Sequence, residues 1–103
     1  MGPGRAELLE KIAESGSISA AAREMGMSYR RAWQLVEAIN ESFVEQVVET
    51  AVGGKRGGGT RVTPFGLEML LRFRRMESKA SATIAQDIDA FTGLMKAPRK
   101  LER

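Results

Sequence analysis

The sequence of 103 residues predicts a mainly α-helical (α+β) fold, with three helices, then two short strands, then a long helix. Three observations predict this order. Apolar residues recur at three- and four-residue steps in three successive segments near the N-terminus. A β-branched, alternating run then precedes five glycines within residues 53–59, and a second short run follows them. A last apolar stripe continues at helical spacing as far as residue 95.

The composition excludes several classes of protein. The sequence contains neither cysteine nor histidine, so we expect no disulfide, no Cys/His zinc site and no histidine general base. We therefore expect neither an enzyme nor a bound cofactor or metal. No apolar run approaches the ~18 residues of a membrane span, and charges interrupt the segment where a signal peptide would be apolar. We expect a cytoplasmic protein that does not contact a membrane.

The net charge is compatible with a nucleic-acid partner without requiring one. Lys and Arg total 16, against 13 Asp and Glu, and the isoelectric point is near 9.7. Because the excess is so small, the positions of the charges say more about a nucleic-acid partner than the net charge does.

The first two helices are short. The first is predicted to begin at Arg5, after a flexible start over residues 2–4, and to end at Gly16. Its buried face is predicted to comprise Leu8, Leu9, Ile12 and Ala13. Ser17 is suited to cap a second helix that ends at Gly26.

A third helix follows after a tight turn. Ser28 is suited to cap it, and it is predicted to cover "YRRAWQLVEAINESF", residues 29–43. Its buried stripe is predicted to comprise Ala32, Val36, Ile39 and Phe43. A short helix, a glycine-containing turn and a longer helix are typical of a helix-turn-helix.

The next segment predicts a hairpin. The runs "QVVETAV" and "TRVT", residues 46–52 and 60–63, are predicted strands, and the glycine segment joins them. Thr63 and Pro64 then begin a helix that is predicted to reach about Leu94. The complete order is that of a winged helix-turn-helix with an added C-terminal helix. We expect a winged DNA-binding domain over residues 1–72, and a dimerisation helix with a basic tail over 73–103.

The glycine segment admits two interpretations. Glycine lets the main chain approach phosphates closely, and Lys55, Arg56 and Arg61 add positive charge there, as in a wing that contacts DNA. The alternative is a solvated loop. The placement directly after a helix-turn-helix favours the wing. A nucleotide-binding loop is disfavoured, because neither G-x-x-x-x-G-K-[ST] nor G-x-G-x-x-G occurs.

Candidate DNA contacts lie mainly at the start of the third helix, because a recognition helix presents its N-terminal end to the major groove. They are Ser28, Tyr29, Arg30, Arg31 and Gln34, with Ser17 and Ser19 at the start of the second helix. Both Ser17 and Ser28 are equally suited to capping alone. Tyr29 is suited either to DNA or to packing against the second helix. Trp33 fits packing better than a DNA contact.

The long helix is expected to form a homodimer. At 1.5 Å per residue, thirty residues span ~45 Å, which is more than a small winged domain can cover. An uncovered apolar stripe would then be buried most simply against a second copy. The residues of this stripe are Met69, Phe73, Met76, Ala80, Ile84, Ile88 and Phe91.

The segment "GSISAAAREMGMSYRRAWQLVEAIN" resembles the N-terminal DNA-binding domain of the molybdate-responsive ModE regulators, which is LysR-like. The segment "VGGKRGGGTRVTPFG" resembles the wing of the same family. The resemblance covers about residues 5–75 and implies DNA binding and dimerisation. Full-length members carry molybdate-binding domains, but this sequence ends at Arg103 and no residue matches the molybdate site. We therefore do not expect molybdate or another oxyanion to bind this chain alone.

These inferences predict a sequence-specific, double-stranded-DNA-binding transcription regulator that binds an inverted repeat as a homodimer. The alternative is a winged-helix module that dimerises and binds protein without reading DNA. Four carboxylates near the third helix give this alternative weight, because they repel phosphate: Glu37, Glu41, Glu45 and Glu49.

Overall fold

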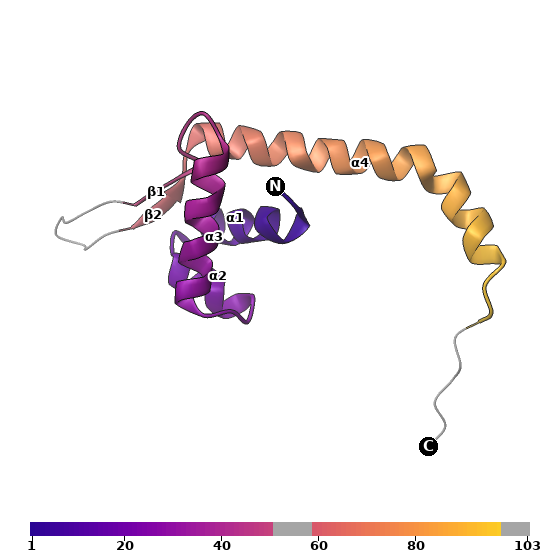
Figure 1. The fold of residues 1–103 in the computed structure, drawn as a ribbon, viewed down its shortest axis with the longest axis horizontal. Helices are drawn as coiled ribbons and strands as arrows, with labels where there is room; N and C mark the ends of the chain where they lie inside the picture. The colour runs from indigo at the N-terminus through magenta and orange to yellow at the C-terminus, as the bar shows by residue number, and fades with distance from the viewer. Residues whose placement is uncertain (51–58, 98–103) are drawn as a thin grey trace, which may run out of the picture. The chain divides into compact units, whose positions relative to one another are not determined.

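The computed structural model describes residues 1–50 and 59–97 (Figure 1). Its elements are α1 (Pro3–Ser15), α2 (Ile18–Glu24), α3 (Tyr29–Ser42), β1 (Val48–Thr50), β2 (Thr60–Val62) and α4 (Pro64–Gly93). The two strands pair in antiparallel register, with Val48 opposite Val62 and Thr50 opposite Thr60. The chain divides into two compact units, Met1–Phe73 and Arg74–Arg103. The predicted mainly α-helical fold with a two-stranded hairpin is confirmed.

Each predicted N-cap is confirmed by a hydrogen bond. The Ser17 hydroxyl accepts from the Ala20 N–H at 3.0 Å, and the Ser28 hydroxyl accepts from the Arg31 N–H at 3.0 Å. The Thr63 hydroxyl accepts from the N–H of Gly66 at 2.9 Å. These side chains satisfy backbone donors that have no partner within the first helical turn.

The start of α1 differs from the prediction. The helix begins at Pro3 rather than Arg5, so residues 3 and 4 are helical instead of flexible. Proline suits the first helical position, because its backbone angle is already helical and its missing N–H would have no helical partner there. Ala13 was predicted to be buried and is exposed, because it lies at the margin of the Leu8, Leu9 and Ile12 stripe.

The ends of two other predicted segments also differ. β1 begins at Val48, not at Gln46: the Val47 carbonyl still accepts from the Thr63 N–H, but the Gln46 carbonyl bonds to the Thr63 hydroxyl rather than to a strand. Residues 51 and 52, which complete the predicted strand, lie outside the described residues. Phe43 follows the last residue of α3 and is only half-buried, where it packs against Phe65.

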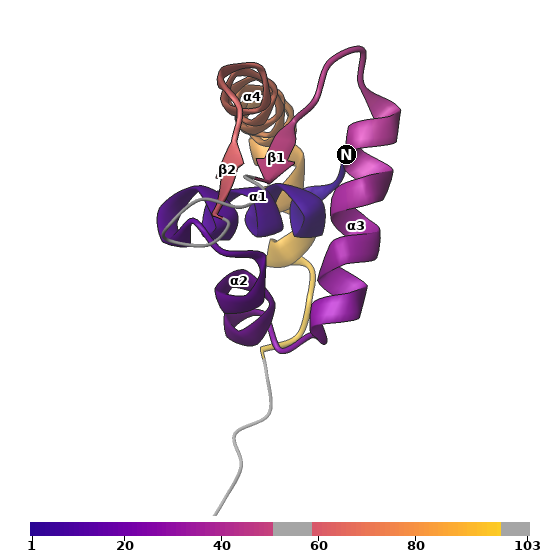
Figure 2. The same cartoon turned by 90° about the vertical axis from the view of Figure 1, so that its left-hand side faces the viewer.

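The core of the first unit lies among α1, α2, α3 and the two strands. α1 lies between the strands and α2, and α3 packs against both α1 and α2 (Figure 2). The largest fully buried side chains are Leu8, Leu9, Ile12, Val36, Ile39 and Val47. Because these residues come from helices and a strand alike, burial of one apolar cluster holds the helices and the hairpin together.

Candidate nucleic-acid interface

The turn between α2 and α3 sets the geometry of the helix-turn-helix. Gly26 has φ +70°, a left-handed conformation that glycine adopts without steric cost. The N–H of Met27 donates to the carbonyl of Ala22 at 3.0 Å and closes the turn. Ala21 and Ala22 are buried, and their small side chains let the neighbouring helices approach closely. Sequence and structure therefore agree on this motif.

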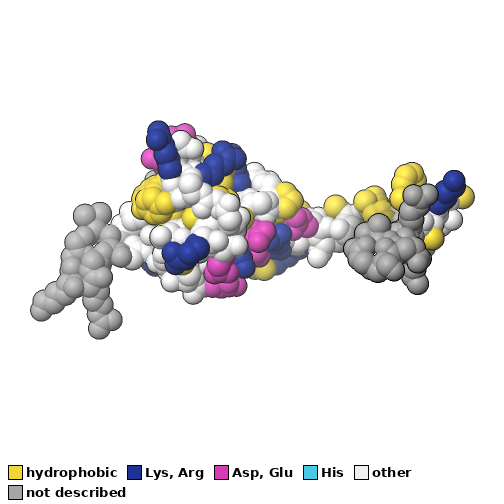
Figure 3. Space-filling model, turned by 90° about the horizontal axis from the view of Figure 1, so that it is seen from below, with side chains coloured by type: hydrophobic (Ala, Val, Ile, Leu, Met, Phe, Trp, Pro, Cys, Tyr) yellow, Lys and Arg dark blue, Asp and Glu magenta, His cyan; other side chains and the backbone are white. Residues whose placement is uncertain are grey.

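The start of α3 is exposed to solvent on the face opposite the core. Ala32 is fully buried, whereas the polar side chains around it are exposed. The exposed candidates are Ser28, Tyr29, Arg30, Arg31 and Gln34. Figure 3 views the end of the first unit where α2 and the start of α3 lie, and its Lys and Arg side chains form separate groups. The structure thus brings the predicted α3 candidates together on an accessible face.

Tyr29 and Trp33 form an aromatic pair one helical turn apart. Their ring centroids are 6.3 Å apart with an interplanar angle of 83°, an edge-to-face arrangement. The indole Nε1–H of Trp33 donates a hydrogen bond to the Tyr29 hydroxyl. Trp33 is half-buried and packs against the core, as predicted, while Tyr29 remains 54% exposed. Tyr29 therefore remains accessible to a partner.

Asn40 anchors the hairpin to α3, a role that the sequence analysis missed. Its Oδ1 accepts from the N–H groups of Val47 at 2.7 Å and Val48 at 3.0 Å, and its Nδ2 donates to the Val48 carbonyl at 3.1 Å. The amide thus bonds to the outer edge of β1 much as a neighbouring strand would. No local pattern signals this role, because the partners lie seven and eight residues away in another element.

The other edge of the hairpin is tied to the turn between α1 and α2. The N–H of Thr60 donates to the carbonyl of Gly16 at 3.1 Å. Gly16 itself has φ +70°, so the turn depends on a residue without a side chain. Together, Gly16 and Asn40 hold both edges of the wing base against the helix-turn-helix.

The junction between the hairpin and α4 is closely packed. Thr63 donates from its N–H to the Val47 carbonyl at 2.9 Å and from its hydroxyl to the Gln46 carbonyl at 2.7 Å. Gly66 lies directly against this junction, and a Cβ at that position would be 2.4 Å from the Val47 carbonyl oxygen. Gly66 is therefore required by packing and not by its backbone conformation.

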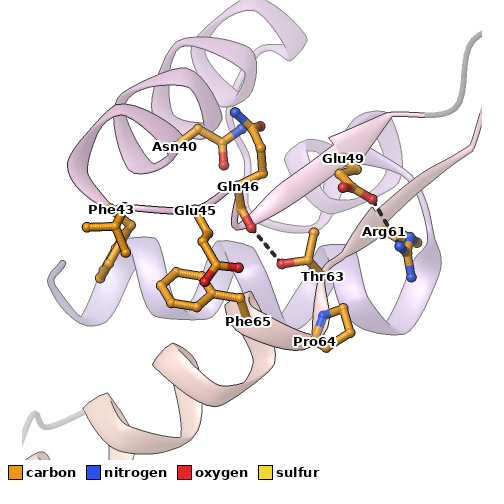
Figure 4. A pocket seen from close by; sticks show the side chains of 10 residues that line it. Asn40, Phe43, Glu45, Gln46, Glu49, Arg61, Thr63, Pro64 and Phe65 are labelled. Carbon is orange, nitrogen blue, oxygen red and sulfur yellow. Dashed lines mark hydrogen bonds and ion pairs between the residues drawn. The ribbon is translucent and has the colours of Figure 1, made fainter.

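A shallow cavity of about 560 Å³ opens beside this junction (Figure 4). Phe43 and Phe65 lie on one side of it, with ring centroids 6.1 Å apart, and Glu49 and Arg61 lie on the other. Among the described residues, no group of His, Cys, Asp or Glu side chains could hold a metal ion.

The predicted wing cations are only partly described. Lys55 and Arg56 lie outside the described residues. Arg61, on β2, is exposed and forms an ion pair with Glu49 on β1, with 3.0 Å between Nη2 and Oε1. Exposed ion pairs of this kind contribute little to stability, because water screens both charges. Breaking the pair between Arg61 and Glu49 would therefore cost little energy.

An ion pair joins α1 to α2, the first helix of the helix-turn-helix. The Lys11 ammonium lies 3.3 Å from the Glu24 carboxylate. The hydrogen bond from Lys11 to Glu24, together with the attraction between their charges, raises the pKa of Lys11 above its usual 10.5. Lys11 therefore stays charged throughout the neutral range.

The second unit exposes apolar side chains along α4. The predicted dimerisation residues Met76, Ala80, Ile84, Ile88 and Phe91 are all exposed there. Phe73 belongs instead to the first unit, where it packs against the core, and Met69 is half-buried in the same unit. Within residues 1–50 and 59–97, no helix has both the length and the apolar content that crossing a membrane requires.

Comparison with solved structures supports the winged helix-turn-helix fold. The DNA complex of the CbnR DNA-binding domain matches with a TM-score of 0.65 and 21% identity, covering 87% of this chain and 98% of that one. The complex of the BenM DNA-binding domain with benA site 1 DNA matches with a TM-score of 0.64 and 15% identity, covering 90% and 99%. At these identities the likeness establishes the fold alone.

Sequence comparison identifies the family. The molybdenum-pterin-binding protein MopB of Rhodobacter capsulatus is 46% identical over 78 residues, which cover 76% of this chain and 29% of that protein. The DNA-binding transcriptional dual regulator ModE of Escherichia coli K12 is 36% identical over 88 residues, covering 82% and 34%. The chain spans about a third of the length of the curated relatives it matches. The predicted resemblance to ModE regulators is thus confirmed.

A family model gives the more general classification. The model of the bacterial regulatory helix-turn-helix proteins of the lysR family matches residues 4–67, which contain α1, α2, α3, both strands and the start of α4. The chain belongs to this lysR family of helix-turn-helix proteins.

Proposed function

We propose that this chain is a sequence-specific DNA-binding transcription regulator that works in the cytoplasm. The observation that carries the proposal is the exposed polar face at the start of α3, within a helix-turn-helix of the lysR family. A recognition helix presents this end to the base edges of the major groove. The CbnR and BenM domains, which have a similar fold, form complexes with DNA, and this likeness of fold supports the proposal.

Arg30 and Gln34 are the proposed base-reading side chains. They are four residues apart, so they lie on one face of α3 about 6 Å apart along its axis. Arg donates two hydrogen bonds to guanine, and Gln pairs with adenine in a similar way. Arg31 lies to the side of this face and is proposed to contact a DNA phosphate. Ser19, at the start of α2, is proposed to contact the sugar-phosphate backbone of the DNA.

The wing is proposed to contact the DNA backbone. Lys55 and Arg56, which lie between the two strands in the sequence, are proposed to supply positive charge to this contact, together with Arg61 on β2. The exposed pair between Arg61 and Glu49 contributes at most about 1 kcal/mol, because water screens both charges. Its loss is offset when Arg61 binds a phosphate instead, because that contact is also a charge-assisted hydrogen bond.

Homodimerisation is proposed through the apolar side chains of α4 in the second unit. Large apolar side chains at three- and four-residue steps are exposed there, and monomeric proteins rarely expose such contiguous stripes. A two-fold dimer would present two recognition helices and would bind an inverted repeat. Molybdate or another oxyanion is not proposed as a ligand of this chain.

The competing function is a winged-helix module that binds protein and does not read DNA. Glu37, Glu41, Glu45 and Glu49 are all exposed, which favours this candidate. However, Glu37 and Glu41 follow Arg30 by about 10 and 16 Å along α3. These separations exceed the Debye length of ~8 Å at physiological salt, so the carboxylates are largely screened from a phosphate at the start of the helix.

Selection of random duplex DNA by the purified chain, followed by sequencing, tests the proposal. We expect two enriched inverted half-sites about 10 bp apart, centre to centre, at near-physiological salt. Arg30→Ala should relax the preference at one base pair and cost about 1–3 kcal/mol of binding free energy. Arg75→Ala is the matched control, because it removes the same charge from an exposed position on α4 in the second unit. If no sequence is enriched and added salt simply releases the bound DNA, the proposal is contradicted and the interaction module is favoured.

A further inference from the structure

The chain contains one tryptophan and one tyrosine, and the structure joins them by a hydrogen bond. Tyr29 is the first residue of α3, and Trp33 lies one turn later. The Trp33 ring is held by its packing against the core, whereas the Tyr29 ring is 54% exposed. A fixed donor therefore bonds to an accessible hydroxyl at the end of α3 that is proposed to face DNA.

The hydrogen bond restricts what the Tyr29 hydroxyl can offer a partner. An indole N–H is a donor only, whereas a phenol has one hydrogen and two acceptor lone pairs. Because Trp33 donates to the Tyr29 oxygen, the hydroxyl hydrogen is left to point toward another acceptor. A hydroxyl that accepts one hydrogen bond also becomes a stronger donor in the next one. The pair therefore presents Tyr29 as a donor.

A small cavity of about 180 Å³ lies beside Tyr29. Three other hydroxyl-bearing residues line it, namely Ser17, Ser19 and Thr60. They come from the start of α2 and from β2, so the cavity lies where the helix-turn-helix meets the base of the wing. Among the described residues, those that line it carry no charged side chain. Phosphate oxygens accept hydrogen bonds and never donate them at neutral pH, and hydroxyl groups are among their usual protein partners.

We propose that Trp33 is a positioning residue that holds the Tyr29 hydroxyl as a hydrogen-bond donor to a DNA phosphate oxygen. This inference rests on the proposed DNA-binding function. Trp33 itself touches no DNA, and its effect on affinity passes entirely through Tyr29. The contact also differs from those of Arg30 and Arg31, because it adds no charge to the interface.

The hydrogen bond is tested first without DNA. In a protein labelled with nitrogen-15, Trp33 gives the single indole N–H resonance of the chain. Tyr29→Phe keeps the ring and removes the acceptor oxygen. We expect the indole proton resonance to move upfield and to exchange faster with solvent in this variant. An indole resonance that is unchanged by the substitution would overturn the inference.

The role in DNA binding is tested by a double-mutant cycle on the selected duplex. Tyr29→Phe should weaken binding about tenfold, the low end for a hydrogen bond to a charged group. Trp33→Phe should weaken it about threefold, because the donor is no longer oriented. The double variant should bind no more weakly than Tyr29→Phe alone, because Trp33 acts only through the hydroxyl. Independent, multiplying effects would mean that Trp33 acts through packing, which would overturn the inference.

Salt dependence and sequence preference separate a phosphate from a base acceptor. Tyr29→Phe should weaken binding equally on all duplexes and should leave the slope of log K against log salt unchanged. Arg31→Gln is the comparison, because loss of a charged phosphate contact should reduce that slope by about 1. A Tyr29→Phe effect confined to one base pair would assign the hydroxyl to a base and overturn the phosphate contact.

A replacement variant covers a failure to fold, and two outcomes distinguish this inference from the proposed function. If Trp33→Phe does not fold, benzothienylalanine at position 33 keeps the bicyclic ring and removes only the N–H. If the unaltered protein selects no DNA sequence, the proposed function itself fails. If the protein selects a sequence and Tyr29→Phe binds it equally well, only this inference fails.

Discussion

Replacement of Gly66 by alanine should destabilise the protein, although the same substitution usually stabilises a helix. Gly66 lies in the first turn of α4 and has no positive φ, so alanine would adopt its backbone conformation without strain. In an open helical position, the change would contribute up to about 1 kcal/mol of stability. The surroundings of Gly66 reverse that expectation.

The added methyl group has no room. Its Cβ would be 2.4 Å from the Val47 carbonyl oxygen, and 2.8 and 2.9 Å from the Cγ1 atoms of Val62 and Val47. The carbonyl cannot simply rotate away, because it accepts hydrogen bonds from Thr63. Overpacking in a closely packed region costs about 1–3 kcal/mol. Since the nearest atom belongs to the backbone, we take the upper half of that range, which leaves a net loss of about 1–2 kcal/mol.

Urea denaturation and thermal melting measure this loss. For a unit of this size, the expected decrease in Tm is about 5–15 °C. Gly4→Ala is the matched control, because Gly4 lies in the first turn of α1 and no atom lies within 4 Å of its added Cβ. It should be neutral or slightly stabilising. A Gly66→Ala protein as stable as the original would refute the close approach of α4 to Val47 and Val62.

Three further changes test other parts of the structure. Asn40→Ala removes three hydrogen bonds to Val47 and Val48 and should cost about 3 kcal/mol of unfolding free energy in urea, whereas Gln34→Ala, an exposed amide on the same helix, should cost little. Ile88→Asp should abolish the proposed dimer in sedimentation equilibrium, and Gln86→Asp, which adds the same charge, should leave it intact. The Lys11–Glu24 pair raises the pKa of Lys11 in the folded state, so its stabilisation is complete below pH 10.5 and is lost as the pH rises through the raised pKa. Glu24→Gln should therefore show a smaller loss of stability above pH 10.5 than the original protein, and an equal loss would contradict the pair.

The elements that sequence analysis predicted correctly are those set by neighbouring residues. Ser17, Ser28 and Thr63 each precede a helix and cap it, since a cap needs only a hydroxyl two or three residues before a free N–H. The buried Ala32, Val36 and Ile39 follow directly from the helical period. The start of α1 was placed wrongly because residues 2–4 were taken as a flexible start, although proline favours the first helical position.

The features that sequence analysis missed depend on contacts between elements. In the sequence, nothing distinguishes Asn40 from any other polar residue near the end of a helix. Its role depends on the position of Val47 and Val48, whose N–H groups donate to its side-chain oxygen. The constraint on Gly66 is likewise set by the Val47 carbonyl, which lies nineteen positions earlier in the sequence. The bond between Trp33 and Tyr29 follows their four-residue spacing, but the period alone does not say which side chain is exposed.

The anchoring of the wing base bears directly on the proposed affinity for DNA. Asn40 and Gly16 bond the two edges of the hairpin to the helix-turn-helix, so α3 and the wing base are held in one geometry before any partner binds. Preorganisation of this kind raises affinity, because less conformational entropy is lost on binding. Asn40 lies about 16 Å along α3 from Tyr29, too far to contact the same phosphate. If the wing and α3 bind DNA together, Asn40→Ala should nevertheless weaken binding under conditions where the variant remains folded. If α3 alone supplies the affinity, loosening the wing base would leave binding unchanged.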